Sequence, residues 1–421
     1  MPKGFYALIL AQFASGLADN ALMILGVFFL QEQGYPAWWA PLLKFFFTLS
    51  YVLLASVVGP LTDAFPKGRV MAIMNTVKLG GVVLLVLGLH PLAAFALIGM
   101  AAAVYAPAKY GLVTESVPAS HLVRANAWLE VSVVMSVLLG VALGGYLIGW
   151  SDRSDVSTLS VLFGYAGMTT RALDAFALVL LVYVISALLN AGLGTMGSAG
   201  VQHPLHGRDM RWSVFWRSNL QLWRDPLGGV SLYVTTLSWG VGAVLQFAVL
   251  TWAQNMVGLS LQQGAYLQAL VAIGVILGAL RASRRFQLFN ARKAMAWGLL
   301  LAALLPLMSL IRHVEMALPL LITAGFSGGM LLVPMNALLQ HRGQKMLTPG
   351  RSIAVQGFNE NLSVLLMLGV YSALLAVGMH LGWIMLLLTL PLLAAVWPLG
   401  VKFWQKQSPK HKNSLNCNKH L

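Results

Sequence analysis

Long apolar stretches alternate with short polar segments along nearly the whole chain. A helix that crosses a bilayer needs about 20 mainly apolar residues, and twelve stretches reach that length. The predicted spans are residues 5–30, 42–61, 70–89, 92–113, 126–148, 172–193, 229–255, 261–280, 294–311, 318–338, 356–377 and 382–401. We therefore expect an all-α integral membrane fold, with twelve transmembrane helices arranged as two six-helix halves.

The longest polar segment separates the sixth span from the seventh and sets the expected domain organisation. An N-terminal half (1–193), a linker (194–228) and a C-terminal half (229–404) are followed by a basic tail (405–421). One face of a helix over residues 210–224 of the linker would carry Trp212, Phe215, Trp216, Leu220 and Trp223. Because arginines flank that apolar face, the pattern predicts an amphipathic linker helix lying at the membrane surface.

The segment Val104–Glu130 is repeated in weaker form by Val333–Glu360. Each copy has a Pro and a polar residue near the end of one apolar run, then an Arg in the connection, then a polar motif opening the next run. The matched residues are Pro107, Lys109, Arg124, Asn126 and Glu130 in the first copy, and Pro334, Asn336, Arg351, Gln356 and Glu360 in the second. Both copies run in the same direction, as in a parallel duplication of a transporter half.

Composition agrees with a polytopic membrane protein. Only 9% of the residues are charged and 58% are hydrophobic, whereas about a quarter of a soluble protein is charged. The net charge of +15 does not indicate nucleic-acid binding, because the basic residues fall between apolar runs and not on one solvated face.

The basic residues instead predict the topology. With the N-terminus inside, 21 of the 27 Lys and Arg residues are cytoplasmic, and only Arg153, Arg171 and Arg312 lie on the opposite side. Since positive residues concentrate on the cytoplasmic side, both termini are expected there. The apolar stretch after Lys3 continues to about Leu30, so we interpret it as a retained first helix and not as a cleaved signal peptide.

Several charged residues interrupt the apolar runs of the N-terminal half, namely Asp19, Lys44, Lys78 and Lys109. A charge inside a spanning helix is costly unless it faces a cavity or a partner. Asp19 lies near the middle of its span, where such folds bind substrate, so we favour a cavity role over a structural ion pair with Lys78 or Lys109. Lys78 either partners a charge or extends toward the cytoplasmic side. Lys109 is suited to meeting a phosphate, and a cavity of both signs suits a zwitterionic head group.

The turn after the second span holds a candidate latch. It reads GPLTDAFPKGR from Gly59 to Arg69. This segment resembles the loop signature of the major facilitator superfamily, roughly G-x-L-x-D-R-x-G-R-R. Gly59, Leu61, Asp63 and Lys67 match that signature, whereas Ala64 and Pro66 depart from it. Asp63, flanked by Lys67 and Arg69, is expected to form a cytoplasmic latch that breaks when the halves rock; the alternative is an ordinary basic turn.

Three glutamates lie near the ends of the repeated spans. Glu115 follows Lys109 by six residues, toward the cytoplasm, and Glu130 and Glu360 lie about one turn into their helices. For the latter two we expect gate pairs with Arg124 or Arg351.

Enzyme, metal and cofactor signatures are absent from the sequence. There is no G-x-x-x-x-G-K-[ST] phosphate-binding loop, and no His is followed five positions later by Asp, the usual glycerolipid acyltransferase pair. His203 and His206 lack further ligands for a metal. The single cysteine, Cys417, excludes a disulfide framework.

Five segments carry most of the polar motifs described above. They are QFASGLADNAL (12–22), AAVYAPAKYGLVTE (102–115), RANAWLE (124–130), VPMNALLQHRG (333–343) and AVQGFNENLSVLLMLGVYS (354–372). Together they resemble the bacterial lysophospholipid transporters of the major facilitator superfamily. The resemblance covers nearly the whole chain up to about Trp404. It implies an inner-membrane carrier that moves 2-acyl lysophospholipids, chiefly lysophosphatidylethanolamine, from the periplasmic leaflet inward. An acyltransferase/acyl carrier protein synthetase then re-acylates them on the cytoplasmic side.

The resemblance also implies cavity roles for Asp19, Asn20 and Lys109, with Glu115, Glu130 and Glu360 as polar supports. The chain departs from the family in the seventh span, where Gln246 stands in V-L-Q-F and the family often has an Arg. The candidate substrate-binding residues are therefore Asp19, Asn20, Lys78, Lys109, Gln246 and Asn336. The candidate gating or structural charges are Asp63, Lys67, Arg69, Glu115, Arg124, Glu130, Arg351 and Glu360.

Two other function classes remain open at this point. A drug or small-solute antiporter would use Asp19 as its proton site and would show steep pH dependence. A membrane-bound lipid-modifying enzyme would need a catalytic pair that the sequence does not offer.

Overall fold

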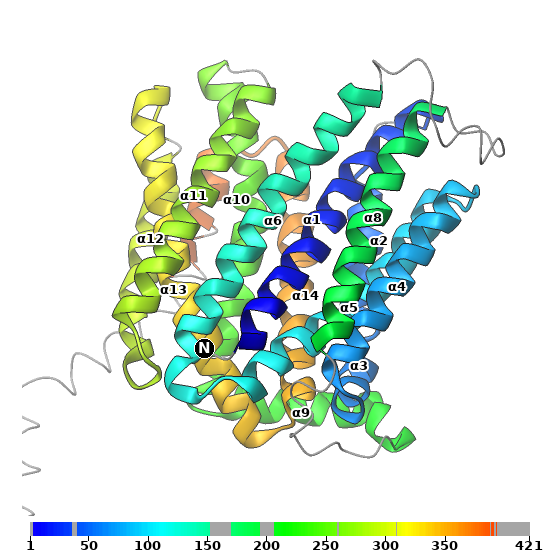
Figure 1. Ribbon diagram of the computed structural model, residues 1–421. Coiled ribbons are helices and arrows are strands. Elements are labelled where there is room, and N and C mark those ends of the chain that lie inside the picture. The colour runs from blue at the N-terminus through cyan, green and yellow to red at the C-terminus, as the bar shows by residue number, and fades with distance from the viewer. Residues whose placement is uncertain are drawn as a thin grey trace, which may run out of the picture.

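The computed structural model describes residues 3–35, 40–151, 170–193, 206–258, 261–308 and 310–387, together with 389, 390 and 393. Within those ranges every regular element is a helix (Figure 1). Ten described helices are long and apolar enough to cross a membrane, or eleven when one bent pair is counted as a single span. The chain is therefore a multi-pass membrane protein, as its hydrophobic pattern predicts.

The N-terminal half follows the predicted spans closely, with one break. Its helices are α1 (Lys3–Glu32), α2 (Ala40–Leu53), α3 (Ala55–Ala64), α4 (Lys67–Val86), α5 (Pro91–Ser116), α6 (Leu122–Ser151) and α8 (Thr170–Leu193).

The predicted span 42–61 is not one straight helix. Helices α2 and α3 meet at an angle of 65°, because Leu54 between them has φ −92° and ψ 1°, outside the helical region. The bend brings α3 against the start of a helix of the other half, α14 (Pro349–Ala376). The bend therefore places α3 of the N-terminal half against α14 of the C-terminal half.

The linker helix α9 (Trp212–Arg224) follows the short η3 (Gly207–Met210) and lies across one end of the bundle, the end where the N-terminus also lies (Figure 1). Its predicted apolar face is divided. Phe215 is buried with its ring 5.1 Å from that of Phe358 in α14, whereas Trp212 and Trp216 remain about half exposed. The amphipathic helix is present as predicted, with one side packed on the protein; its position at the membrane surface stays a prediction.

The C-terminal half continues the pattern. Its helices are α10 (Gly228–Val257), α11 (Leu261–Arg285), η4 (Leu288–Ala294), α12 (Met295–Met308), α13 (Val314–Met346) and α14. Residues 381–387 are helical, and most of the remaining predicted span 382–401 lies outside the described residues. The predicted tail, residues 405–421, lies wholly outside them.

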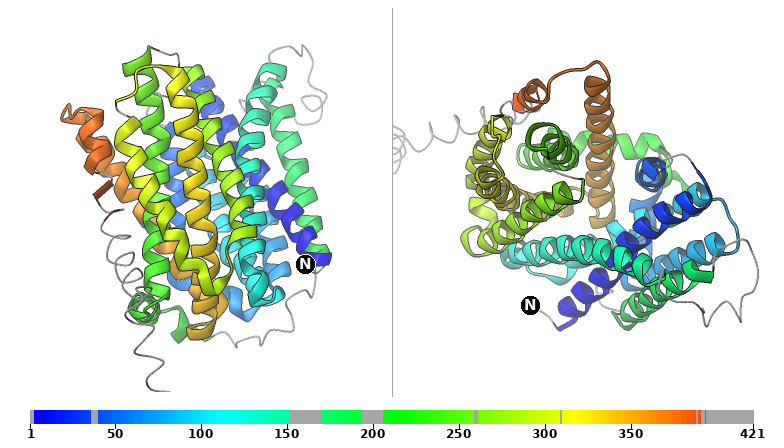
Figure 2. Two further views of the ribbon diagram at one scale, coloured as in Figure 1. Left: turned by 90° about the vertical axis from the view of Figure 1, so that its left-hand side faces the viewer. Right: turned by 90° about the horizontal axis from the view of Figure 1, so that it is seen from above.

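The two halves lie side by side around a shared interface. Seen from above, α1, α4, α6 and α8 gather on one side and α10 to α13 on the other, with α14 extending beside α10 (Figure 2). Helix α6 packs against α11 and α13, while α14 packs against α2, α3 and α5. Close packing within the C-terminal half depends on Gly325, because an added Cβ there would lie 2.0 Å from the Val271 carbonyl oxygen.

Candidate functional site

An ion pair joins α1 to α4 within the membrane-spanning part of the N-terminal half. Lys78 Nζ lies 2.6 Å from Asp19 Oδ2 and 2.9 Å from Oδ1, and the Tyr183 hydroxyl of α8 donates to Asp19 Oδ1 at 2.6 Å. The Lys78 side chain is 1% exposed and that of Asp19 is 20% exposed. Lys78 is thus a partner charge, and of the two pairings considered for Asp19 the structure contains the one with Lys78.

Polar side chains hold this pair in place. Lys78 Nζ also donates to Ser15 Oγ at 3.1 Å, and Ser15 Oγ donates to Asn75 Oδ1 at 2.9 Å. Asn75 Nδ2 donates to Ser186 Oγ at 2.7 Å, and Ser186 Oγ donates to the Ala11 carbonyl at 2.8 Å. This buried chain fixes α1, α4 and α8 to one another, because an unpaired polar group there would be costly. The Asp19 side chain nevertheless remains partly accessible.

Lys109 does not contact the Asp19–Lys78 pair but interacts with both residues electrostatically. Its ammonium is 3.5 Å from Gln12 Oε1 and 4.4 Å from the centre of the Tyr110 ring, and it interacts electrostatically with Lys78 and Asp19. None of the described carboxylates forms an ion pair with it. Lys109 is therefore a buried cation whose closest contacts are neutral groups, while Glu130 of α6 interacts with it electrostatically without forming an ion pair.

The other predicted substrate-binding residues do not contact the ion pair. Asn20 Nδ2 donates to the Gly16 carbonyl at 2.7 Å, within α1. Gln246 of α10 is exposed, and its backbone carbonyl accepts from Gln268. Asn336 is buried in α13 and accepts a 3.0 Å hydrogen bond from Gln356 of α14. The roles of these residues in binding stay predictions.

Asp63 of α3 caps the start of α14 in the opposite half. Its carboxylate accepts from the Thr348 hydroxyl, from the Gly350 amide at 2.8 Å and from the Arg351 amide at 3.2 Å. A carboxylate at a helix N-terminus satisfies free backbone amides and complements the helix dipole. An added Cβ on Gly59 would lie 2.8 Å from the Arg351 Cα, so Gly59 permits the close approach. These contacts support the predicted latch.

The two basic residues after Asp63, Lys67 and Arg69, lie in different surroundings. Lys67 is buried, with its ammonium 2.6 Å from Glu115 Oε1 in α5 and 4.0 Å from Asp63 Oδ1. Arg69 is exposed. Lys67 thus links the latch carboxylate to α5, and Arg69 takes no part in an ion pair among the described residues.

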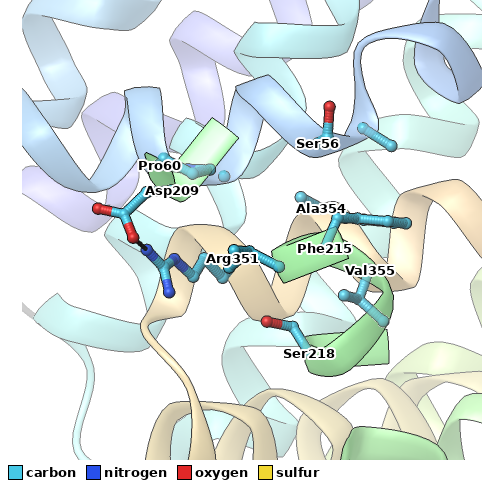
Figure 3. Close-up of a pocket in the computed structure, with 11 residues that line it drawn as sticks. Ser56, Pro60, Asp209, Phe215, Ser218, Arg351, Ala354 and Val355 are labelled. Atoms are coloured by element: carbon cyan, nitrogen blue, oxygen red, sulfur yellow. Dashed lines mark ion pairs between the residues drawn. The ribbon is translucent and has the colours of Figure 1, made fainter. Parts of the chain in front are cut away.

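A further ion pair joins the C-terminal half to the linker. Arg351 Nη2 lies 2.7 Å from Asp209 Oδ1 of η3, and Figure 3 shows the two side chains meeting at the edge of a small pocket. That pocket is lined by residues of α3, α9 and α14, among them Ser56, Phe215 and Ala354. The linker, the N-terminal half and the C-terminal half therefore converge at one point.

The gate pairs expected for Glu130 and Glu360 are wrong. Arg351 pairs with Asp209, and Glu360 Oε1 accepts from Gln356 within its own helix at 2.8 Å. Arg124 is exposed, and among the described residues no ion pair joins it to Glu130, which is buried. Glu130 and Glu360 point into the bundle, away from the arginines in the connections.

Sequence reasoning missed a reciprocal amide pair that joins the repeats. Asn126 Nδ2 donates to Gln340 Oε1, and Gln340 Nε2 donates to Asn126 Oδ1, both at 2.9 Å. The pair joins α6 to α13 and is buried. Both residues lie in the segments that resemble the family, but the sequence does not indicate that they face each other.

Comparison with known proteins agrees with this architecture. The model of the Major Facilitator Superfamily matches residues 8–365. The lysophospholipid transporter LplT of Yersinia enterocolitica is 35% identical over 379 residues, covering 90% of this chain and 89% of that protein. LplT of Yersinia pestis is 35% identical over the same length and covers 88% of that protein.

Solved structures share the fold at low sequence identity. The human organic anion transporter MFSD10 (TETRAN) superposes with a TM-score of 0.71 at 14% identity, covering 95% of this chain and all of that chain. The transporter FucP in its outward conformation gives a TM-score of 0.69 at 16% identity, covering 94% of this chain and 97% of that chain. The chain therefore belongs to the major facilitator superfamily and, within it, to the family of the bacterial lysophospholipid transporters.

Proposed function

We propose that this protein moves lysophospholipids, chiefly lysophosphatidylethanolamine, from the outer to the inner leaflet of the bacterial inner membrane. The observation that carries the proposal is the 35% identity, along 90% of the chain, to proteins named lysophospholipid transporters. A partly exposed carboxylate beside buried cations within apolar helices supports it, because such groups suit a zwitterionic head group.

The proposed cycle uses the two ends of the bundle in turn. In the described state Asp63, Thr348 and Arg351 hold the halves together at the α9 end. The head group enters from the opposite end, and the acyl chain stays among apolar side chains or in lipid between helices. Breaking the Asp63 contacts lets the halves rock and release the lipid at the α9 end.

The α9 end is assigned to the cytoplasm, with both termini there, because most Lys and Arg residues outside the apolar runs belong to that side. Lipid delivered to the cytoplasmic leaflet is then available to an acyltransferase/acyl carrier protein synthetase for re-acylation. Asp19, Asn20 and Lys109 are the proposed head-group residues, with Glu115, Glu130 and Glu360 as polar supports and Gln246 and Asn336 contributing from the C-terminal half.

A proton antiporter for drugs or small solutes is the second candidate, and the 20% exposure of the Asp19 side chain favours it. A carboxylate that is partly accessible and paired with a lysine can exchange a proton. This candidate predicts transport with steep pH dependence and no preference for molecules with a single acyl chain.

Uptake of labelled lysophosphatidylethanolamine by spheroplasts that lack their own transporter separates the candidates. Wild type, Asp19→Asn and Lys109→Ala are compared at matched expression. Uptake by wild type with loss in both variants supports the proposal and its site. No uptake by wild type refutes lysophospholipid transport and leaves the antiporter. If the labelled lipid is already covalently altered at the earliest time point, the protein is a lipid-modifying enzyme and not a transporter.

A further inference from the structure

Lys44 of α2 lies inside an apolar run, and none of the described carboxylates is within ion-pair distance of it. Lys78 pairs with Asp19, and Lys109 lies against Gln12. Lys44 itself is exposed. A cation inside a spanning helix needs a counter-charge or a polar partner, and the described residues leave room for one from outside the protein.

The packing of α2 shows which way Lys44 faces. Leu43 packs toward Gly26 of α1, and Ser50 Oγ donates to the Ala96 carbonyl of α5 at 3.2 Å, so this side meets the N-terminal half. Val52 packs in the cluster that contains Phe358 of α14. At 100° per residue, Lys44 lies between these two sides. Tyr51 lies on the same flank, and both Tyr51 and Glu360 of α14 act electrostatically on Tyr110 of α5, so this flank faces the space between the halves.

Its surroundings on that face are aromatic and acidic. Tyr51, seven residues later, shares the face, and the Asp19 carboxylate acts electrostatically on both Lys44 and Tyr51. The Lys44 ammonium lies 5.9 Å from the centre of the Phe47 ring. Lys44 is the fifth residue of α2, which begins at the end of the bundle opposite α9 (Figure 1). Lys44 is thus nearer the proposed substrate entrance than Asp19.

We propose that Lys44 binds the phosphate of the lysophospholipid head group, an assignment that rests on the proposed function. Lys78 already neutralises Asp19, so Lys44 is the accessible positive charge on this face. An ammonium meets a phosphate as a compact point charge with three donors. The competing explanation is that Lys44 extends to the phosphates of the surrounding bilayer and does not touch the substrate.

Kinetics of lysophosphatidylethanolamine uptake in proteoliposomes test the assignment. Lys44→Gln should raise KM roughly tenfold, the equivalent of one lost hydrogen bond to a charged group, with kcat nearly unchanged. Lys44→Arg should restore most of the affinity. Lys293→Gln, which removes an exposed cation of η4, is the matched control and should leave KM unchanged.

A phosphate-free competitor makes the test specific. Monoacylglycerol should inhibit wild type and Lys44→Gln equally, because it has no group for Lys44 to bind, whereas lysophosphatidylethanolamine should lose its advantage over it in the variant. Lys44→Met, which keeps the aliphatic stem, serves if Lys44→Gln is poorly inserted. An unchanged KM in either inserted variant refutes the Lys44 assignment alone. Failure of wild type to transport lysophospholipid refutes the proposed function itself.

Discussion

Replacing Asp63 with Asn should open the α9 end of the protein. The carboxylate is 5% exposed and accepts hydrogen bonds from the Thr348 hydroxyl and from the Gly350 and Arg351 amides across the interface between the halves. A hydrogen bond to a charged group is worth about 1.5–3 kcal/mol. Asn keeps one acceptor but loses the charge, so the closed arrangement should lose about 2 kcal/mol, which corresponds to roughly a 30-fold shift toward opening.

Thiol labelling measures that shift. Ser56 is 3% exposed and lines the pocket between α3 and α14, so Ser56→Cys becomes accessible only when the halves separate there. The experiment uses nanodiscs and a background in which the single native cysteine, Cys417, is replaced by Ser. Asp63→Asn should raise the maleimide labelling rate by roughly the same 30-fold factor, or until opening is complete.

Asp225→Asn is the matched control. Asp225 forms a two-point pair with Arg342, with contacts of 2.5 and 3.0 Å, wholly outside the α3–α14 contact. Loss of the Asp225–Arg342 pair should lower the melting temperature without changing the rate at which Ser56→Cys is labelled. If Asp63→Asn labels within twofold of wild type while remaining folded, Asp63 is not a latch and the reasoning is refuted.

Three further outcomes follow from the contacts. Lys78→Ala should lower the free energy of unfolding by about 3–5 kcal/mol, because it leaves the partly buried Asp19 charge unpaired. The double variant Asp19→Asn/Lys78→Met should recover the melting temperature but not transport. Equal melting temperatures for wild type, Lys78→Ala and the double variant would contradict this. Gly59→Ala should hold the α9 end open, because its Cβ would lie 2.8 Å from the Arg351 Cα, and normal protection of Ser56→Cys would contradict it. The hydrogen bond from Arg342 holds the pKa of Asp225 below its usual 3.8, so its contribution to stability is present above that pH and is lost as the pH falls below it. Melting in Asp225→Asn should accordingly be less sensitive to pH in that range, and an unchanged acid profile would count against it.

Hydrophobic length was sufficient to place the spanning helices. An apolar run of about 20 residues has few alternatives in a membrane protein. The helices from α1 to α14 overlap eleven of the twelve predicted spans, with α2 and α3 sharing one, and the helical residues 381–387 overlap the start of the twelfth. The bend at Leu54 was missed because no glycine or proline marks it; Pro60 lies six residues later, inside α3. The bend is a tertiary feature that brings α3 to α14.

The sequence indicated which residues belong to the site better than it indicated which residues they contact. Low charge content makes Asp19 and Lys78 conspicuous, but whether they meet depends on the rotation of α1 and α4 about their axes, which the sequence left open. The same ambiguity explains the error at Glu130 and Glu360, since one turn of helix separates a residue facing the connection from one facing the bundle. Arg351 is paired instead by Asp209 of the linker, a segment that has no counterpart within either repeat.

Reconstitution into liposomes shows whether the purified protein itself carries lysophospholipid across a bilayer. Fluorescent lysophosphatidylethanolamine is added to the outside of proteoliposomes, and albumin then extracts the probe that has stayed in the outer leaflet. We expect a protein-dependent, saturable fraction of probe that albumin no longer extracts, and only slow transfer of a two-chain phosphatidylethanolamine. A protected fraction equal to that of protein-free liposomes would show that the protein does not move lysophospholipid.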